Sequence, residues 1–169
     1  MSAFFLPTFA GLYKPVTLSP RILENLAAKV REKKVFPWAT ARRNHYVIVE
    51  QSNQKLHFRA TTLLTGAFLG LNDVTLRTDK VPGAVHYSVS YWIWAGYCIG
   101  LSAFIVLAVL GSIFLFQIGG YSAYNPFHSW ILWSMLVLWG LLWPWILITM
   151  HKLFVPKALI RILEEANKE

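Results

Sequence analysis

The sequence predicts an α+β membrane protein, in which a small N-terminal α+β domain of one helix plus antiparallel strands precedes a two-helix transmembrane hairpin and a short C-terminal amphipathic helix. Three observations support this fold class. Of the 169 residues, 56% are hydrophobic and only 14% are charged, whereas about a quarter of an average soluble domain is charged. No Asp, Glu, Lys or Arg occurs between Lys80 and Lys152. Before Lys80, apolar residues recur first with a helical period and then with the period of two that is typical of strands.

The chain begins with an apolar N-terminal arm, residues 1–18, of which residues 1–13 carry no charge. Its large side chains need a cover, because an exposed apolar segment binds another surface or aggregates. That cover can be the bilayer surface, the arm's own domain or another subunit. The expected partner-binding residues are Phe4, Phe5, Leu6 and Phe9.

Residues 19–88 are predicted to form a cytoplasmic α+β domain. Ser19 is suited to cap a helix and Pro20 to occupy its first turn, and apolar residues follow at helical spacing up to Val30. Four later segments alternate between apolar and polar residues and predict antiparallel strands. These segments are residues 45–50, 55–61, 74–77 and 85–89. A domain of this size buries only a marginal core, so support from a membrane or a partner is expected.

Basic and aromatic residues gather after the predicted helix. One interpretation is an interfacial anchor, whose rings lie among lipid headgroups while its cations bind anionic lipid. An ordinary loop, in which a Trp covers the domain core, explains the same residues equally well. The predicted lipid-headgroup residues are Lys33, Lys34, Phe36, Trp38, Arg42 and Arg43.

The charge-free stretch is long enough for two membrane spans. We predict transmembrane helices over residues 89–117 and 129–154, joined by an extracytoplasmic loop at 118–128 that contains Gly-Gly and Asn-Pro. The loop lacks Lys and Arg whereas both flanks carry them, so the positive-inside rule places both termini in the cytoplasm. We expect a multi-pass protein of a bacterial inner membrane. Residues 155–169 follow as a cytoplasmic C-terminal helix that Pro156 opens, and we expect it to dock on the N-terminal domain or to lie along the membrane.

Small residues share one face of the first predicted span, and Trp residues crowd the second. Gly96 and Gly100 have the four-residue spacing that permits close approach of another helix. We expect Trp rings of the second span to lie across these glycines. Trp139 falls near the middle of its span, where a partner helix or a bound lipid or pigment would cover it. The predicted helix-packing residues are Gly96, Gly100, Ala103 and Gly111.

The sequence contains no recognisable catalytic motif. Phosphate-binding, dinucleotide-binding, zinc-protease and nucleophile-elbow patterns are absent. The single cysteine, Cys98, permits neither an intrachain disulfide nor a cysteine-based metal site, and neither a metal nor a cofactor is expected. A membrane histidine can nevertheless ligate haem or a chlorophyll magnesium. The candidate residues for binding such a group are His128, His151, Trp139 and Trp143.

These observations favour a non-enzymatic accessory or scaffolding subunit of a larger integral membrane complex, whose hairpin packs against partner helices. The expected partners are other integral membrane subunits and anionic phospholipids. The net charge of +8 follows from the basic flanks of a membrane protein, so nucleic acid is not an expected partner. One alternative is a lipid-, quinone- or pigment-binding membrane protein that uses the Trp-rich hairpin. Another is a membrane enzyme whose site is completed by another chain.

Overall fold

The structure, a computed structural model, describes residues 7–36, 44–118 and 126–169. The chain divides into two compact units. The first, called the domain from here on, combines the chain up to Trp94 with His151–Glu169. The second, called the hairpin, is Ala95–Met150.

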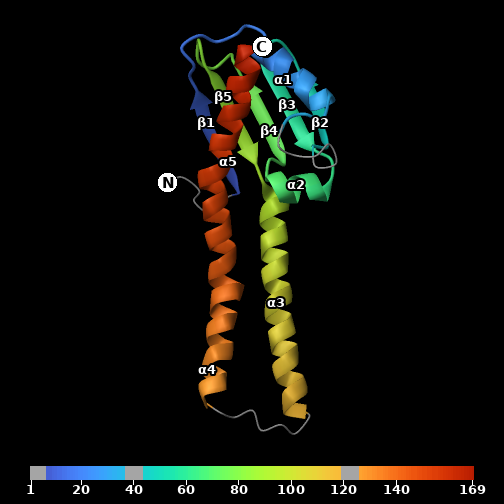
Figure 1. Ribbon diagram of the computed structural model, residues 1–169, viewed down its shortest axis with the longest axis vertical. Coiled ribbons are helices and arrows are strands. Elements are labelled where there is room, and N and C mark those ends of the chain that lie inside the picture. Colours follow the sequence, from blue (N-terminus) through green and yellow to red (C-terminus); the bar gives the residue numbers. More distant parts are fainter. Residues whose placement is uncertain (1–6, 37–43, 119–125) are drawn as a thin grey trace. The chain divides into compact units, whose positions relative to one another are not determined.

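The domain is built on one antiparallel sheet with the strand order β1-β5-β4-β3-β2 (Figure 1). Its strands are β1 (Thr8–Tyr13), β2 (Tyr46–Gln51), β3 (Lys55–Ala60), β4 (Asp73–Arg77) and β5 (Val85–Ser90). The alternation that predicted the strands also assigns their faces, since Val74 and Leu76 are fully buried while Thr75 between them is not. The prediction of an α+β chain with antiparallel strands is confirmed.

Strand β1 differs from the prediction, which placed its residues in a separate arm. It pairs with β5 over its whole length, and the Tyr91 N–H donates a 2.9 Å hydrogen bond to the Pro7 carbonyl. Phe9 packs against the core, with its ring centroid 6.3 Å from that of Tyr87. An uncharged, apolar segment is stabilised at the sheet edge because its backbone groups find partners there. The arm is therefore part of the domain from Thr8 onward.

Helix α1 (Ile22–Arg31) begins two residues later than a helix capped by Ser19 would. Arg21 occupies the N-cap, and the Ile22 N–H donates to the Ser19 carbonyl at 3.2 Å, so residues 19–22 form one turn before the helix. The apolar face is confirmed. Its buried residues are Ile22, Leu23, Leu26, Ala27 and Val30.

Helix α2 (Leu63–Leu69) is too short to show a helical period and was not expected from the sequence. The Thr62 side chain caps it by accepting a 3.2 Å hydrogen bond from the Thr65 N–H. Gly70 ends it at φ 66°, the left-handed conformation that glycine adopts without strain.

Helix α5 (Trp143–Lys168) runs through the predicted boundary at residue 155, and Pro156 lies inside it. The predicted helix break is wrong, because one proline removes only one backbone hydrogen bond and the residues after it are held by the core. The buried residues of this part of α5 are Val155, Leu159, Ile162, Leu163 and Ala166. They join α1 on the same face of the sheet (Figure 1). The C-terminal residues thus pack on the N-terminal domain and complete its core, which was one of the two expected positions.

The end of α5 is tied to the chain before α1 by side-chain amides. Asn167 accepts a hydrogen bond from the Ser19 N–H at 2.8 Å and donates to the Thr17 carbonyl at 2.9 Å. The Asn25 side chain donates to the Ala166 carbonyl at 3.0 Å. These contacts fix the first and last helices of the domain to each other.

The hairpin contains most of α3 (Trp92–Ile118), then α4 (Pro126–Met135), the π-helical segment η2 (Leu136–Leu142) and the start of α5. Two helical stretches, Trp92–Ser112 and Trp133–Lys168, are long and apolar enough to cross a membrane, and each contains an 18-residue window whose mean hydropathy is 2.2 and 1.6, respectively. In η2 the Trp143 N–H donates to the Leu138 carbonyl, five residues earlier. This pattern widens the helix by comparison with an α-helix.

Candidate functional site

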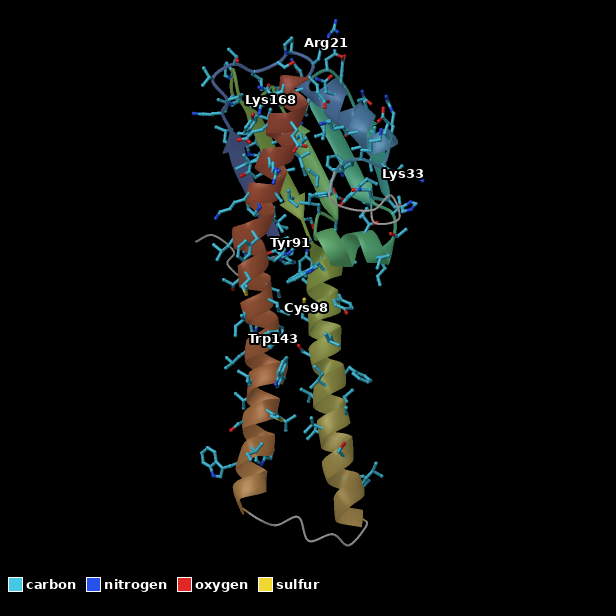
Figure 2. The ribbon with its side chains drawn as sticks, viewed as in Figure 1. Arg21, Lys33, Tyr91, Cys98, Trp143 and Lys168 are labelled. Atoms are coloured by element: carbon cyan, nitrogen blue, oxygen red, sulfur yellow. The ribbon has the colours of Figure 1, made fainter. Side chains whose placement is uncertain are left out.

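The chain leaves the domain after Trp94 and returns to it at His151, and these two residues stack on each other. Their ring centroids are 4.1 Å apart and their planes differ by 19°. The Tyr91 ring lies 4.9 Å from that of His151, and Tyr91 is fully buried where β5 passes into α3 (Figure 2). We call Tyr91, Trp94 and His151 the junction cluster. The two domain residues that flank the hairpin in the sequence, Trp94 and His151, therefore belong to one aromatic cluster within the domain.

Helix α2 makes room at the junction with two glycines four residues apart. A Cβ at Gly70 would overlap the His151 ring, and one at Gly66 would lie 2.6 Å from the Asn72 side-chain nitrogen. Asn72 caps α3, because its Oδ1 accepts a 2.8 Å hydrogen bond from the Ile93 N–H. These contacts position the first turn of α3 and the imidazole of His151. The four-residue spacing of the two glycines is the sequence signal that could have indicated this close approach.

Three buried polar atoms at the junction have no hydrogen-bond partner within the described part of the chain. They are the Tyr91 hydroxyl, Asn72 Nδ2 and His151 Nε2. His151 was a candidate for cofactor binding, but its ring packs within the junction cluster and serves there as a packing group. The His128 side chain lies outside the described residues. Over the described ranges, no group of three His, Cys, Asp or Glu residues could hold a metal ion.

One of the predicted lipid-headgroup residues, Phe36, lies in the core of the domain. Phe36 is 1% exposed and packs beside Tyr46, with ring centroids 6.2 Å apart. Asn44 fixes it by accepting from the Phe36 N–H at 3.1 Å and donating to the Phe36 carbonyl at 3.0 Å. Phe36 is therefore a core residue and does not anchor the chain in a membrane. Three further members of the set, Trp38, Arg42 and Arg43, lie outside the described residues.

The two remaining members of that set, Lys33 and Lys34, follow α1. Lys33 is labelled in Figure 2 and adopts φ 57°. The Lys34 ammonium lies 2.9 Å from the Glu32 carboxylate, and this hydrogen bond holds the pKa of Glu32 below its usual range. Part of the positive charge of Lys34 is therefore compensated within the chain.

Of the predicted partner-binding residues, the structure describes Phe9. Its ring lies 6.3 Å from that of Tyr87 and 6.1 Å from that of Tyr91. Phe9 is therefore partly covered by its own domain, which was one of the three alternatives. Phe4, Phe5 and Leu6 lie outside the described residues.

The hairpin packs through a glycine that was not predicted. A Cβ at Gly140 would lie 2.5 Å from a methyl group of Val106, so the two helices approach closely there. The α3 residues buried within the hairpin include Cys98 and Ser102. The predicted packing residues face roughly the opposite side of α3, given 100° of rotation per residue. They are Gly96, Gly100 and Gly111, where nothing lies within 4 Å of a Cβ position, and the exposed Ala103. The expectation that Trp rings cover these glycines within the hairpin is wrong.

An apolar hollow of about 200 Å³ lies between α3 and the helix opposite it in the hairpin. Its lining residues are Ile105, Val106, Val109, Met135, Leu136 and Trp139. The Trp139 and Trp143 rings are in contact, with centroids 4.8 Å apart. Ser102, one turn before Ile105, is 3% exposed and its hydroxyl has no partner among the described residues. Of these side chains, Trp139 lines the hollow, whereas Ser102 and Trp143 are not among its lining residues.

The sheet face opposite to α1 and α5 carries paired charges. Asp73 lies 2.5 Å from the His57 Nε2 through one carboxylate oxygen and accepts from Arg59 at 2.8 Å through the other. Lys55 pairs with Glu50 of the neighbouring strand. Cross-strand pairing explains these charged residues, so this face does not require a ligand.

The described residues thus define a chain with a five-stranded antiparallel sheet, α-helices on one face of it, and two helices apolar enough to span a membrane. Comparison with protein-family models, curated proteins and solved structures finds no match for this chain.

Proposed function

We propose that this protein is a non-enzymatic accessory or scaffolding subunit of a larger integral membrane complex, joined to other integral membrane subunits through its hairpin. The observation that carries the proposal is the unoccupied glycine face of α3, formed by Gly96, Gly100, Ala103 and Gly111. A glycine inside a helix lowers the stability of the helix by about 1 kcal/mol relative to alanine. Nothing in the hairpin lies within 4 Å of a Cβ position at the three glycines of this face. Small residues allow the backbone of another helix to come close, so a partner helix explains their presence.

The proposed orientation has two membrane crossings and both termini in the cytoplasm, in a bacterial inner membrane. The stack of Trp94 on His151 supports an even number of crossings, because these two residues flank the hairpin in the sequence and belong to the same domain. All Lys and Arg residues lie in the domain and none lies in the hairpin, which favours a cytoplasmic domain. Labelling of cysteines introduced at each terminus checks this orientation.

Anionic phospholipids are the second proposed partner. Lys33 and Lys34 supply the charge that supports this within the described residues, and Lys34 is 72% exposed. Each basic residue near an anionic surface contributes about 1 kcal/mol. Glu32 compensates part of the Lys34 charge, which weakens the attraction to anionic lipid. Because Phe36 is buried and supplies no aromatic anchor, the proposed lipid binding at these lysines is electrostatic.

The experiment that tests the proposed function compares two substitutions on α3. Gly100→Leu places a side chain on the glycine face, whereas Ala108→Leu places the same side chain on an exposed position about 80° away. The tagged chain is purified from its native membranes in mild detergent, and co-purifying proteins are quantified by native mass spectrometry. We expect stoichiometric membrane partners with the unmodified chain and with Ala108→Leu, and at least a tenfold loss with Gly100→Leu. An unmodified chain without a protein partner, or equal behaviour of the two variants, would contradict the proposal.

A further inference from the structure

We infer that α2 is an interfacial helix, whose exposed residues Leu63 and Leu64 lie among the lipids at the bilayer surface and hold the domain against the membrane. The inference rests on the proposed membrane insertion of the chain. It goes beyond the role of an accessory subunit, because the partner of this surface is the bilayer itself. It involves neither the glycine face of α3 nor the lysines that follow α1.

The outer side of α2 is apolar and open. Leu63 is 71% exposed and Leu64 is 54% exposed. No charged residue occurs between Arg59 and Asp73, so the whole segment around the two leucines is uncharged. Adjacent exposed leucines on such a segment favour contact with another apolar phase.

The contacts of α2 identify this phase as lipid. A Cβ at Gly66 would lie 3.1 Å from a methyl carbon of Ile93. Just after α2, the Asn72 Oδ1 accepts hydrogen bonds from the N–H groups of Ile93 at 2.8 Å and Trp94 at 3.3 Å. The stretch of α3 that is apolar enough to cross a membrane begins at Trp92. Helix α2 therefore packs on the first turn of that stretch and lies beside the start of α3 (Figure 1), where a span enters the bilayer.

Other large apolar side chains are open at the same end of the domain. Within the described part of the domain, the exposed Leu, Phe and Trp residues are Leu63, Leu64, Trp92, Leu153 and Phe154. Trp92 directly follows the junction residue Tyr91, and Leu153 and Phe154 follow His151 within one helical turn. Trp is enriched at membrane–water interfaces. A bilayer surface contacts all of these residues at once, because each lies next to the junction cluster.

Helix α2 can approach lipid because its own chain closes both of its ends. Unpaired backbone groups are unfavourable in lipid. At the start, the Thr62 hydroxyl accepts from the Thr65 N–H at 3.2 Å, and the two threonine hydroxyls are 2.8 Å apart. At the end, the Gly70 N–H donates to the Gly66 carbonyl at 3.1 Å. A short helix with paired ends and an uncharged outer side suits the boundary between headgroups and acyl chains.

The test locates fluorescent labels on α2 in the full chain, inserted into nanodiscs of zwitterionic phosphatidylcholine. Leu63→Cys and Leu64→Cys are labelled separately in a Cys98→Ala background, because Cys98 is the single cysteine of the chain. Quenching by a phosphatidylcholine with a nitroxide on its acyl chain is compared with quenching by iodide in the water. Compared with a label on a water-exposed part of the domain, we expect roughly threefold stronger quenching by the nitroxide lipid and roughly threefold weaker quenching by iodide.

Two further labels serve as references. Val16→Cys is the matched control, because Val16 is apolar and fully exposed. It follows the far end of β1, a strand of six residues whose near end is bonded to Tyr91 through Pro7, and such a strand is about 20 Å long. Its label should be quenched by iodide and not by the nitroxide lipid. Phe104→Cys reports insertion itself, since Phe104 is exposed within the apolar stretch of α3, and its label should be quenched by the nitroxide lipid.

A charge variant separates the apolar contact from electrostatic binding. Replacing Lys33 and Lys34 by Gln is expected to leave the quenching of both α2 labels unchanged, because contact of leucine with lipid needs no charge. Loss of lipid quenching in this variant would assign the contact to the lysines and overturn the inference.

The remaining outcomes distinguish this inference from the proposed function. Labels at Leu63→Cys and Leu64→Cys that behave like the label at Val16→Cys, while Phe104→Cys is quenched by lipid, would overturn the inference alone. Protection of the α2 labels from both quenchers would also overturn it, because a protein surface would then cover α2. Absence of lipid quenching at Phe104→Cys would refute membrane insertion and the inference together.

Discussion

Single glycines serve two distinct purposes in the domain. Gly70 and Gly83 both adopt a positive φ, 66° and 69°, which favours glycine over every other residue. A Cβ at Gly70 would also meet the His151 ring, whereas nothing lies within 4 Å of a Cβ at Gly83. The two positions therefore differ in packing while they share the same backbone requirement.

Gly70→Ala is expected to lower the free energy of unfolding by about 2–5 kcal/mol. About 1–2 kcal/mol arises from the positive φ, and about 1–3 kcal/mol from forcing a methyl group into the His151 ring. Gly83→Ala is the matched control and should lose only the first part. Denaturant unfolding of the purified protein in detergent measures both values.

A second substitution tests the cause. Adding His151→Ala to Gly70→Ala should recover part of the loss, because the methyl group then has space. Equal losses at Gly70 and Gly83 would show that the contact with His151 does not constrain α2.

At the scale of the element, a strand or helix can be predicted from the sequence where many of its side chains share the same environment, such as one buried face. Strands β2 to β5 alternate between a covered and an open face, so period two located them. β1 was not located because its uncharged residues hardly alternate, and its pairing with β5 is a long-range contact. Pro156 indicates a helix boundary by its local effect on the backbone, whereas long-range contacts with the core hold α5 continuous through it.

The candidate sites were predicted less well than the strands, for a physical reason. The sequence located small residues and Trp on the two spans, but not which side of each helix faces inward. Phe36 illustrates the same point in the domain, since its burial depends on a hydrogen-bonding partner, Asn44, eight residues away. In the second span η2 shifts the helical phase, and this shift has no local sequence signature.

The hairpin offers its own test of helix approach. Gly140→Ala places a methyl group 2.5 Å from Val106 and is expected to destabilise the hairpin by about 1–3 kcal/mol. Gly111→Ala, where a Cβ meets nothing, should cost nothing and add up to about 1 kcal/mol through helix propensity. Circular dichroism during titration from mild detergent into SDS measures these differences. Combining Gly140→Ala with Val106→Ala should restore stability in part. If the losses of the two single variants simply add in the double variant, the helices do not approach each other at Gly140 and Val106.

At the scale of the whole molecule, the domain is discontinuous in sequence. Its sheet and α1 precede the hairpin, while Leu159, Ile162 and Leu163 of its core follow it. Burial of one such side chain contributes about 1.5–3 kcal/mol, so these three together match much of the 5–15 kcal/mol by which a typical domain is stable.

Joining residues 1–94 to residues 151–169 by a short Gly/Ser linker is therefore expected to give a folded domain without the hairpin. The linker can be short because Trp94 and His151 stack at 4.1 Å. Residues 1–94 alone should remain unfolded or aggregate. Near-UV circular dichroism and dispersion of amide resonances distinguish the two chains. A stably folded 1–94 fragment would show that α5 is dispensable for the core.

The position of the hairpin between β5 and the last turns of α5 has a consequence for biosynthesis. The ribosome releases the strands of the sheet first and the core residues of α5 last, on the order of ten seconds later at usual elongation rates. In the proposed topology, α5 returns to the side of the sheet only after the hairpin has crossed the bilayer twice. In a chain that fails to insert correctly, α5 does not cover Phe58, Leu76 and the rest of this sheet face. The exposed apolar residues then make the chain a substrate for proteases and chaperones. A folded domain then marks each molecule whose membrane insertion has succeeded.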